Sequence, residues 1–320
     1  MALVAYFLQT HREPEQIYRL LATLRRGSPG APLLVGHCPS AEPLDRARLD
    51  RVGALCFRPA RQPRRGDWSL LEPYFTAVET FDRNGVAYDW LVYLSGQDYP
   101  VQPLARTEAR LTGGPWDGYL TWRSADVPSA DGRRHQARRR YLYRYRELPR
   151  ARPLLAALRR LNGLQSWWHV HLTYAPRLGV RARRTPFGPQ LRLYWGSQWT
   201  MLRRSCAERV AEAGRSASAL AVHFARTVCP DEAFAQTVLV NDGRFRLCDA
   251  NLRYADLAGT RDGRPRVLRL ADGPALVAGG HCFARKFDLA ADAAILDWLD
   301  ERIAEGSPAP PAAALSPLPG

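Results

Sequence analysis

The sequence predicts an α/β protein built on a Rossmann-like, mostly parallel sheet flanked by helices. Three short apolar runs, residues 2–9, 32–38 and 53–57, have the length and composition of buried strands. Between the first two, residues 14–27 carry apolar side chains at helical spacing behind a proline. Strand, helix and strand in this order indicate parallel neighbours, because a parallel pair needs a crossover connection.

The rest of the chain continues the alternation. Ser69 and Glu72 have capping-box spacing and predict the start of a helix. Further strands are expected over residues 89–94, 116–122, 191–195, 251–257 and 267–270, and further helices over 154–161, 203–213, 230–238 and 290–303. We expect one domain over residues 1–306, with a basic Arg/Tyr insertion at about 124–190, and a disordered Pro/Ala-rich tail over 307–320.

Composition argues against several classes of protein. No run of about 18 apolar residues could cross a bilayer, and the first eight residues are too short for a signal peptide. The six cysteines are scattered without a CxxC pair, which argues against a zinc site and a disulfide framework. We therefore expect a cytoplasmic protein, either free or peripheral on the inner face of the membrane.

The positive charge is concentrated in one segment. The chain has a net charge of +15, and Arg133 to Arg160 contains eleven Arg and one acid, Glu147. This pattern favours a surface for anionic lipid head groups or an acidic glycan. A plain solvated loop is the alternative.

Lys286 is the only lysine in the chain, beside 45 arginines. A lysine ammonium is a compact point charge, whereas guanidinium spreads its charge over a planar fork. Its retention in a chain so rich in arginine predicts a contact with an anion in a tight site. The alternative is a solvated surface cation without a role.

Five short motifs occur in order along the chain: residues 94–100 (LSGQDYP), 196–199 (GSQW), 230–234 (PDEAF), 251–254 (NLRY) and 283–288 (FARKFD). Together they resemble the core-2/I-branching β-1,6-N-acetylglucosaminyltransferase family, which includes the peptide O-xylosyltransferases. The similarity runs from about Ala5 to Trp298. It implies a GT-A-like fold, a UDP-sugar donor, inversion at the anomeric carbon and no metal requirement.

Sugar transfer from a nucleotide expels a diphosphate, whose growing negative charge needs a fixed cation or a metal. No Asp-x-Asp follows a predicted strand, and Asp98 alone is too little for a divalent cation, so we expect no metal and no other cofactor. The resemblance assigns Arg253 and Lys286 to the diphosphate. It also assigns Glu232 as the base that deprotonates the acceptor. Pro230-Asp231-Glu232 is equally typical of a helix start, with Asp231 as a capping residue.

The remaining candidates lie beside these motifs. On the donor side, Asp98 is expected to bind hydroxyls of the sugar or ribose, with a plain turn residue as the alternative. His11, just after the first strand, is expected near the nucleotide, and Trp68 and Arg65 are expected to help hold the donor. On the acceptor side, Trp199 is expected to stack on a sugar face, beside Asp231, although a buried core Trp is also typical.

The leading hypothesis is an inverting, metal-independent transferase that moves GlcNAc or xylose from a UDP-sugar to a saccharide or glycolipid hydroxyl. A UDP-sugar-binding protein or hydrolase on the same fold is one alternative. The other is a nucleic-acid-binding protein, in which the segment Arg133 to Arg160 contacts phosphates and nearby aromatic residues stack on bases: Tyr141, Tyr143, Tyr145, Trp167 and Trp168. We do not expect nucleic acid as the partner, because no recognised binding module is present.

Overall fold

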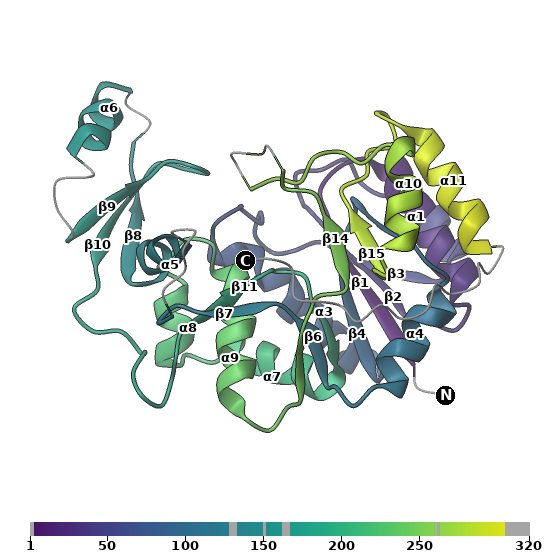
Figure 1. The fold of residues 1–320 in the computed structure, drawn as a ribbon, viewed down its shortest axis with the longest axis horizontal. Coiled ribbons are helices and arrows are strands. Elements are labelled where there is room, and N and C mark those ends of the chain that lie inside the picture. Colours follow the sequence, from purple (N-terminus) through teal and green to yellow (C-terminus); the bar gives the residue numbers. More distant parts are fainter. Residues whose placement is uncertain are drawn as a thin grey trace.

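The computed structural model describes residues 3–127, 133–149, 152–161, 167–258, 260 and 263–304. Within this part, one central sheet contains β1 (Val4–Thr10), β2 (Leu33–His37), β3 (Ala54–Phe57), β4 (Trp90–Ser95), β6 (Gly118–Leu120), β12 (Met201–Arg203) and β13 (Leu247–Asp249). The strand order is β3-β2-β1-β4-β12-β6-β13, and β12 alone among these seven runs antiparallel to its neighbours (Figure 1). The predicted α/β fold class with a mostly parallel central sheet is confirmed.

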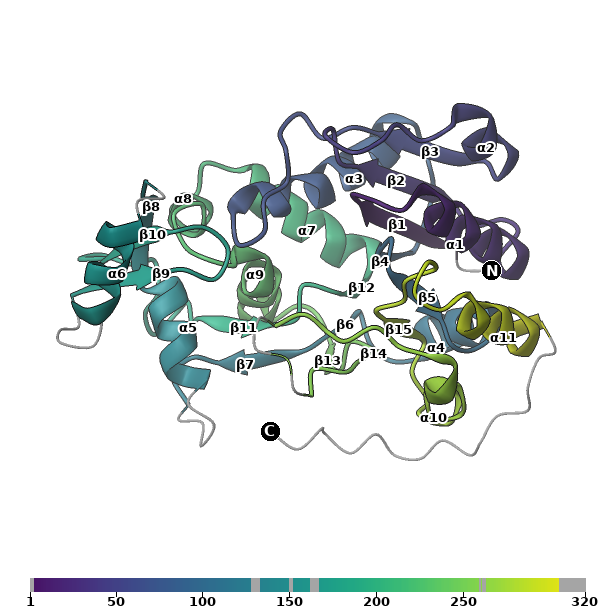
Figure 2. The same ribbon diagram turned by 90° about the horizontal axis from the view of Figure 1, so that it is seen from above.

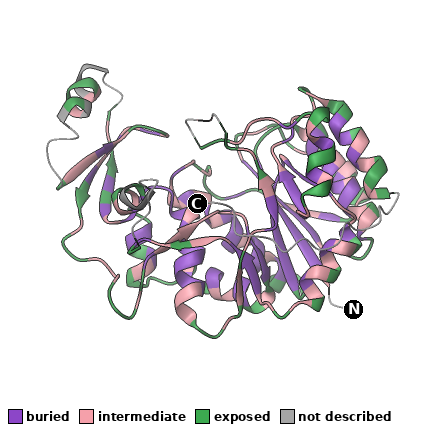
Figure 3. Cartoon of the chain, viewed as in Figure 1, coloured by how far each residue is buried: buried purple, intermediate pink, exposed green. Residues whose placement is uncertain are grey.

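Helices cover both faces of this sheet (Figure 2). One layer holds α1 (Pro14–Gly27), α4 (Leu104–Gly113), α10 (Gly273–Ala278) and α11 (Ala293–Ala304), and the other holds α3 (Glu72–Arg83), α7 (Arg204–Arg215), α8 (Ala219–Phe224) and α9 (Phe234–Asp242). Tyr6 and Leu8 face the first layer, whereas Ala5 and Phe7 face the second, because successive strand residues point to opposite sides. The sheet is therefore buried on both faces, as the purple strands in Figure 3 show.

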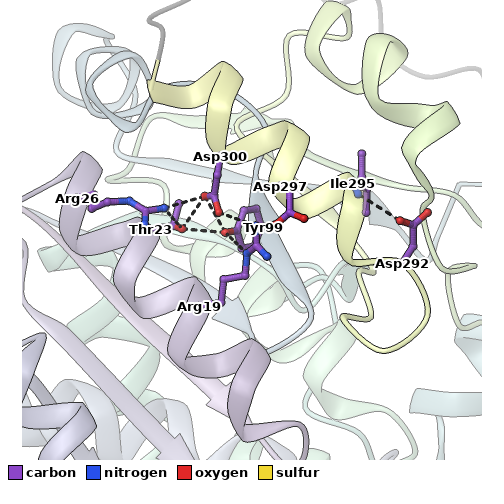
Figure 4. Close-up of polar contacts among 8 residues, drawn as sticks. All are labelled: Arg19, Thr23, Arg26, Tyr99, Asp292, Ile295, Asp297 and Asp300. Carbon is purple, nitrogen blue, oxygen red and sulfur yellow. Dashed lines mark hydrogen bonds and ion pairs between the residues drawn. The ribbon is translucent and has the colours of Figure 1, made fainter.

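A polar network fixes α11 to the first layer (Figure 4). Asp300 of α11 accepts hydrogen bonds from Thr23 of α1 at 2.8 Å and from the Tyr99 hydroxyl at 2.9 Å. Arg19 and Arg26 of α1 also pair with Asp300, at 2.8 and 3.0 Å. Tyr99 belongs to β5 (Asp98–Pro100), so this network also holds the strand that carries Asp98.

A small second sheet joins three of the sequence motifs. It has the order β14-β15-β5, with β14 (Arg253–Ala255) parallel to β15 (Phe283–Arg285) and β5 antiparallel to β15. In this register Arg285 lies opposite Asp98, and Arg253 lies opposite Phe283. Residues that are more than 150 positions apart in the sequence thus become neighbours. β11 (Tyr194–Gly196) and β7 (Trp122–Ser124) form a further antiparallel pair.

The basic insertion folds into a lobe at one end of the molecule (Figures 1 and 2). Its elements are α5 (Arg133–Tyr141), β8 (Tyr143–Glu147), α6 (Arg152–Leu161), β9 (Trp168–His171) and β10 (Arg177–Arg181), with β8, β10 and β9 in an antiparallel sheet. Tyr141, Tyr143 and Tyr145 are buried, at 0%, 9% and 9% exposure. A solvated loop is therefore the wrong prediction for this segment, and these tyrosines have no open faces for stacking on bases.

Several local predictions need correction. Asp67, not Ser69, caps the helical turn η1 (Trp68–Leu70) by accepting from the Ser69 amide, and α3 begins at Glu72 without a side-chain cap among the described residues. Residues 267–270 form no strand in the described structure, because they lead into η3 (Leu270–Asp272) with Leu268 as their only buried side chain. The expected strand over 116–122 divides between β6 and β7.

None of the described helices is long and apolar enough to cross a membrane. The predicted disordered tail, residues 307–320, lies outside the described residues.

Candidate active site

A buried ion pair lies at the centre of the candidate site. Arg253 Nε is 3.0 Å from Asp98 Oδ1, and the two side chains are 1% and 0% exposed. The other Asp98 oxygen accepts from the Ser95 amide and hydroxyl, both at 2.5 Å, and Arg253 Nη2 donates to the Tyr93 carbonyl at 2.8 Å. Asp98 is thus the buried counter-ion of Arg253, a role that the sequence did not indicate. Its contact with donor hydroxyls stays a prediction.

Arg253 keeps one donor group unused. Its Nη1 is buried without a hydrogen-bond partner in the described part of the chain. Burial lowers the pKa of Arg253 to about 10, although the Asp98 carboxylate opposes that change. An unpaired charged N–H is costly, by about 1–3 kcal/mol or more, so native structures seldom contain one without a reason. An anionic ligand would satisfy it.

Arg285 adds a second guanidinium beside the first. Its Cζ lies 4.3 Å from the centre of the Trp199 ring, and Arg253 Cζ lies 5.3 Å from the same ring. Arg285 Nε is also buried without a hydrogen-bond partner among the described residues, and burial lowers the pKa of Arg285. Asp98 is thus paired with Arg253, and its negative charge also acts on Arg285.

Trp199 supports this cationic pair. Trp199 is in the loop between β11 and β12, and its ring centre lies 5.0 Å from that of Tyr93 in β4. Neighbouring Gln198 donates to the Tyr93 hydroxyl at 2.8 Å, which fixes the loop against β4. Trp199 thus contacts Arg253 and Arg285 through its π system. Its predicted stacking on an acceptor sugar stays a prediction.

Lys286 directly follows Arg285 at the end of β15. Its backbone carbonyl accepts from the Leu268 amide at 2.9 Å, and the residue is half-buried. In the parallel pairing of β14 with β15, Arg253 lies opposite Phe283 and Ala255 opposite Arg285. Lys286 therefore follows the end of β15, three residues beyond the position opposite Arg253. The diphosphate contact itself stays a prediction.

The predicted base lies in a separate ion pair. Glu232 ends the helical turn η2 (Pro230–Glu232), and its Oε2 accepts from Arg140 Nη1 of α5 at 2.5 Å. The side chains of Arg140 and Glu232 are 13% and 31% exposed. Burial disfavours the Arg140 charge, but Glu232, together with the nearby Tyr141, Cys229 and Tyr174, outweighs this effect, so the pKa of Arg140 is raised. Glu232 is thus held by a residue that the basic lobe contributes.

Asp231 has a different environment from its neighbour. It is 7% exposed, and its Oδ1 has no hydrogen-bond partner within the described residues. Burial, and then the negative charge of Glu232, raise the pKa of Asp231 to about 7, against the opposing effects of Arg140 and Arg65. In the described structure η2 has no side-chain cap, so the capping role expected for Asp231 is wrong.

A family model matches part of the sequence. Residues 166–270, about a third of the chain, match the Core-2/I-Branching enzyme family model. Over this segment the chain is similar to the Core-2/I-branching enzymes. The match contains the motifs at residues 196–199, 230–234 and 251–254, and it confirms the family that the motifs predicted. The motifs around Asp98 and Lys286 lie outside the matched segment. No curated protein sequence matches the chain significantly.

Solved structures with partial similarity are glycosyltransferase complexes. One is glucosyl-3-phosphoglycerate synthase from Mycobacterium tuberculosis with Mn²⁺, UDP and glucosyl-3-phosphoglycerate, at 17% identity and a TM-score of 0.27, covering 56% of this chain and 57% of that one. Another is the same enzyme with Mn²⁺, UDP and phosphoglyceric acid, at 18% identity and a TM-score of 0.28, covering 56% of each chain. This chain thus spans little more than half the length of these structures.

The remaining donor candidates, Arg65, His11 and Trp68, lie outside the segment that matches the family model. The Arg65 guanidinium is 4.8 Å from the Tyr174 ring centre, and its charge acts on both Asp231 and Arg285. His11 follows β1, and burial, together with positive groups that include Arg285, lowers its pKa. Trp68 packs its ring against Phe75 and Phe234, at 5.7 and 5.0 Å between centroids. This contact is core packing, and a donor contact of Trp68 stays a prediction.

The described residues around the cationic pair form no cluster of metal ligands. In the ranges that the structure describes, no group of three or more His, Cys, Asp or Glu side chains is arranged to hold a metal ion. The nearby carboxylate of Asp98 is engaged by Arg253 and Ser95.

Proposed function

We propose that the protein is an inverting, metal-independent glycosyltransferase that moves a sugar from a UDP-sugar to a hydroxyl of a saccharide or glycolipid. GlcNAc and xylose are the proposed donor sugars, because the family resemblance includes transferases of both. One observation carries the proposal most. Arg253, which is buried, and Arg285, which is half-buried, both lie near the Trp199 ring, and each has a buried N–H group without a hydrogen-bond partner among the described residues.

In the proposed reaction the acceptor hydroxyl oxygen attacks the anomeric carbon as the bond from that carbon to the diphosphate oxygen breaks. The hydroxyl proton passes to the carboxylate of Glu232, and UDP leaves with the bonding electron pair. Attack from the side opposite the leaving group inverts the anomeric configuration. Arg140 holds Glu232 through Oε2, so Oε1 is the oxygen that we assign to the proton.

The leaving diphosphate gains negative charge, and three cations are assigned to it: Arg253, Arg285 and Lys286. Fixed donors in a buried site stabilise such charge without reorganisation and are worth several kcal/mol in the transition state. Buried guanidinium groups replace the usual role of a divalent ion in this proposal. His11, Arg65 and Trp68 are assigned to the donor, and Trp199 and Asp231 to the acceptor side.

The metal-independence is tested by chelation. The purified protein is incubated with UDP-GlcNAc or UDP-xylose and an acceptor panel, and UDP release is measured with excess EDTA and with added Mn²⁺. We expect turnover to continue in EDTA. Loss of turnover with the chelator and recovery with manganese would show that the arginine account is wrong.

The residue assignments are tested by substitution. Lys286→Ala should reduce turnover by on the order of 100-fold or more with folding intact. Glu232→Gln should bind UDP but not transfer, whereas Glu208→Gln, which breaks a comparable Arg–Glu pair at 2.6 Å on α7, should leave transfer unchanged. Transfer by Glu232→Gln at the normal rate would place the base elsewhere.

The hydrolase alternative gives a different product. Free sugar would then appear at the same rate with and without any acceptor in the panel. Acceptor-dependent formation of a glycosidic product distinguishes the transferase from it.

A further inference from the structure

The basic lobe, defined here as residues 133–184, contains almost all of the excess charge of the protein. It holds fifteen Arg and one acid, Glu147, which gives +14 of the total +15. Glu147 is paired with Arg64 at 2.7 Å and lies 3.8 Å from Arg177, so it offsets residues at the base of the lobe. The outer part of the lobe therefore presents uncompensated positive charge.

The two faces of the lobe sheet differ in character. On the inner face, Tyr143 and Tyr145 of β8 are buried, and Arg177 of β10 donates to the Gly66 carbonyl at 2.6 Å. The outer face carries the alternate residues of β8, Arg144 and Arg146, which are exposed. The inner face joins the lobe to the body, whereas the outer face exposes Arg144, Arg146 and Val180, although Val170 on the same face is buried.

Apolar groups accompany the arginines on the outer side. Val180 lies opposite both Arg144 and Trp168 in the sheet register, so the three side chains share the outer face. Val180 is 48% exposed and Trp167, just before β9, is 62% exposed. Exposed apolar and aromatic side chains thus lie together among the arginines on this face, whereas a plain solvated charged surface would carry only the charged side chains.

The helix beside this face has the same mixed character. In α6, Leu155 and Leu158 lie one turn apart and are half-buried, whereas Arg160 is exposed. Figure 1 shows α6 at the far end of the lobe, next to β9. A basic amphipathic helix with a neighbouring Trp is typical of elements that lie in the head-group region of a bilayer.

We propose that the outer face of the lobe, formed by Arg144, Arg146, Val180, Trp167 and α6, docks on an anionic phospholipid bilayer. Arginines near such a surface each add to binding, while Trp and Val enter the head-group boundary. A nucleic acid fits less well, because the lobe tyrosines that could stack on bases are buried. The exposed apolar side chain of Val180 would also make no favourable contact with a charged phosphate backbone. This proposal is independent of the proposed transferase activity.

Vesicle co-sedimentation of the whole protein tests it. We expect binding to vesicles of phosphatidylcholine mixed with phosphatidylglycerol, little binding to phosphatidylcholine alone, and weaker binding as salt is raised. The double variant Arg144→Glu/Arg146→Glu should partition at least roughly tenfold more weakly, since each Arg near the surface contributes about fivefold and two are reversed. Trp167→Ala should also weaken binding.

The matched control is Arg46→Glu/Arg51→Glu on α2 (Arg46–Arg51), an exposed helix at the opposite end of the molecule (Figure 2). It makes the same change of charge and should bind vesicles like the parent. Thermal unfolding of each variant establishes that it is folded, which is expected because the altered side chains are exposed. Equal loss in the control would show that net charge alone acts.

Two other results would overturn the proposal. One is equal binding to neutral and anionic vesicles, or to neither. The other is salt-sensitive binding of single-stranded RNA or DNA by the parent, lost in the lobe variant, with no vesicle binding.

Discussion

Replacement of Asp231 by asparagine should stabilise the fold at alkaline pH. Its pKa is raised from the ordinary 3.8 to about 7, first by burial and then by the Glu232 charge. At about 1.4 kcal/mol for each pH unit, the ionised form then costs roughly 4 kcal/mol of folding free energy. Because the pKa of Asp231 is higher in the folded state than in the unfolded state, its contribution to stability is fully present below about pH 4 and is lost as pH rises through about 7.

The measurement is urea unfolding of the parent and Asp231→Asn across this range. The two proteins should be alike near pH 4, and the variant should be more stable by up to roughly 4 kcal/mol near pH 8. Asp242→Asn is the matched control, because Arg244 and Arg209 lower the pKa of Asp242 to about 2 and its replacement should instead reduce stability at pH 8. A parent whose stability does not fall between pH 5 and 8, or a variant no more stable at pH 8, would refute the reasoning.

Three further predictions concern contacts described above. Arg285→Ala should weaken UDP binding by about 10- to 100-fold in calorimetry, since a charged hydrogen bond is worth about 1.5–3 kcal/mol; an unchanged Kd would remove it from the site. Arg140→Gln should lower kcat by about 10- to 100-fold because Glu232 is misplaced, while KM for the donor stays constant. Arg140→Lys should rescue kcat in part, and a change in KM alone would contradict this role of Arg140. Asp300→Ala should cost about 2–3 kcal/mol in urea unfolding, because four donors lose their acceptor. Asp297, which also pairs with Arg19, is itself 63% exposed, so Asp297→Ala should cost less than about 1 kcal/mol.

The central sheet was predictable because its strands are buried on both faces and therefore appear as continuous apolar runs. The runs at residues 2–9, 32–38 and 53–57 became β1, β2 and β3, and the repeat behind Pro14 became α1. β12 was missed because its three residues lead directly into α7 and leave no separate pattern. Arg144 and Arg146 alternate with buried tyrosines in β8, but the abundance of arginine concealed that strand period.

The sequence singled out candidate site residues only where a motif or an unusual residue marked them. Arg253 and Glu232 were proposed from their motifs and Lys286 first as the only lysine, whereas Arg285 was overlooked among 45 arginines although it adjoins that lysine. Arg140 could not be linked to Glu232 from the sequence, because the two residues are 92 positions apart and meet only when the lobe folds against η2. The same applies to Asp98, whose pairing with Arg253 depends on the register of three strands.

With Glu232 as the proposed base, its bond to Arg140 makes the lobe part of the proposed catalytic site. Exchanging residues 133–184 with the corresponding piece of a relative would remove a ligand of the carboxylate along with the lobe. A functional chimera therefore needs an arginine at the end of its transplanted first helix. Grafting without it should yield a folded body that still retains nucleotide but turns over slowly.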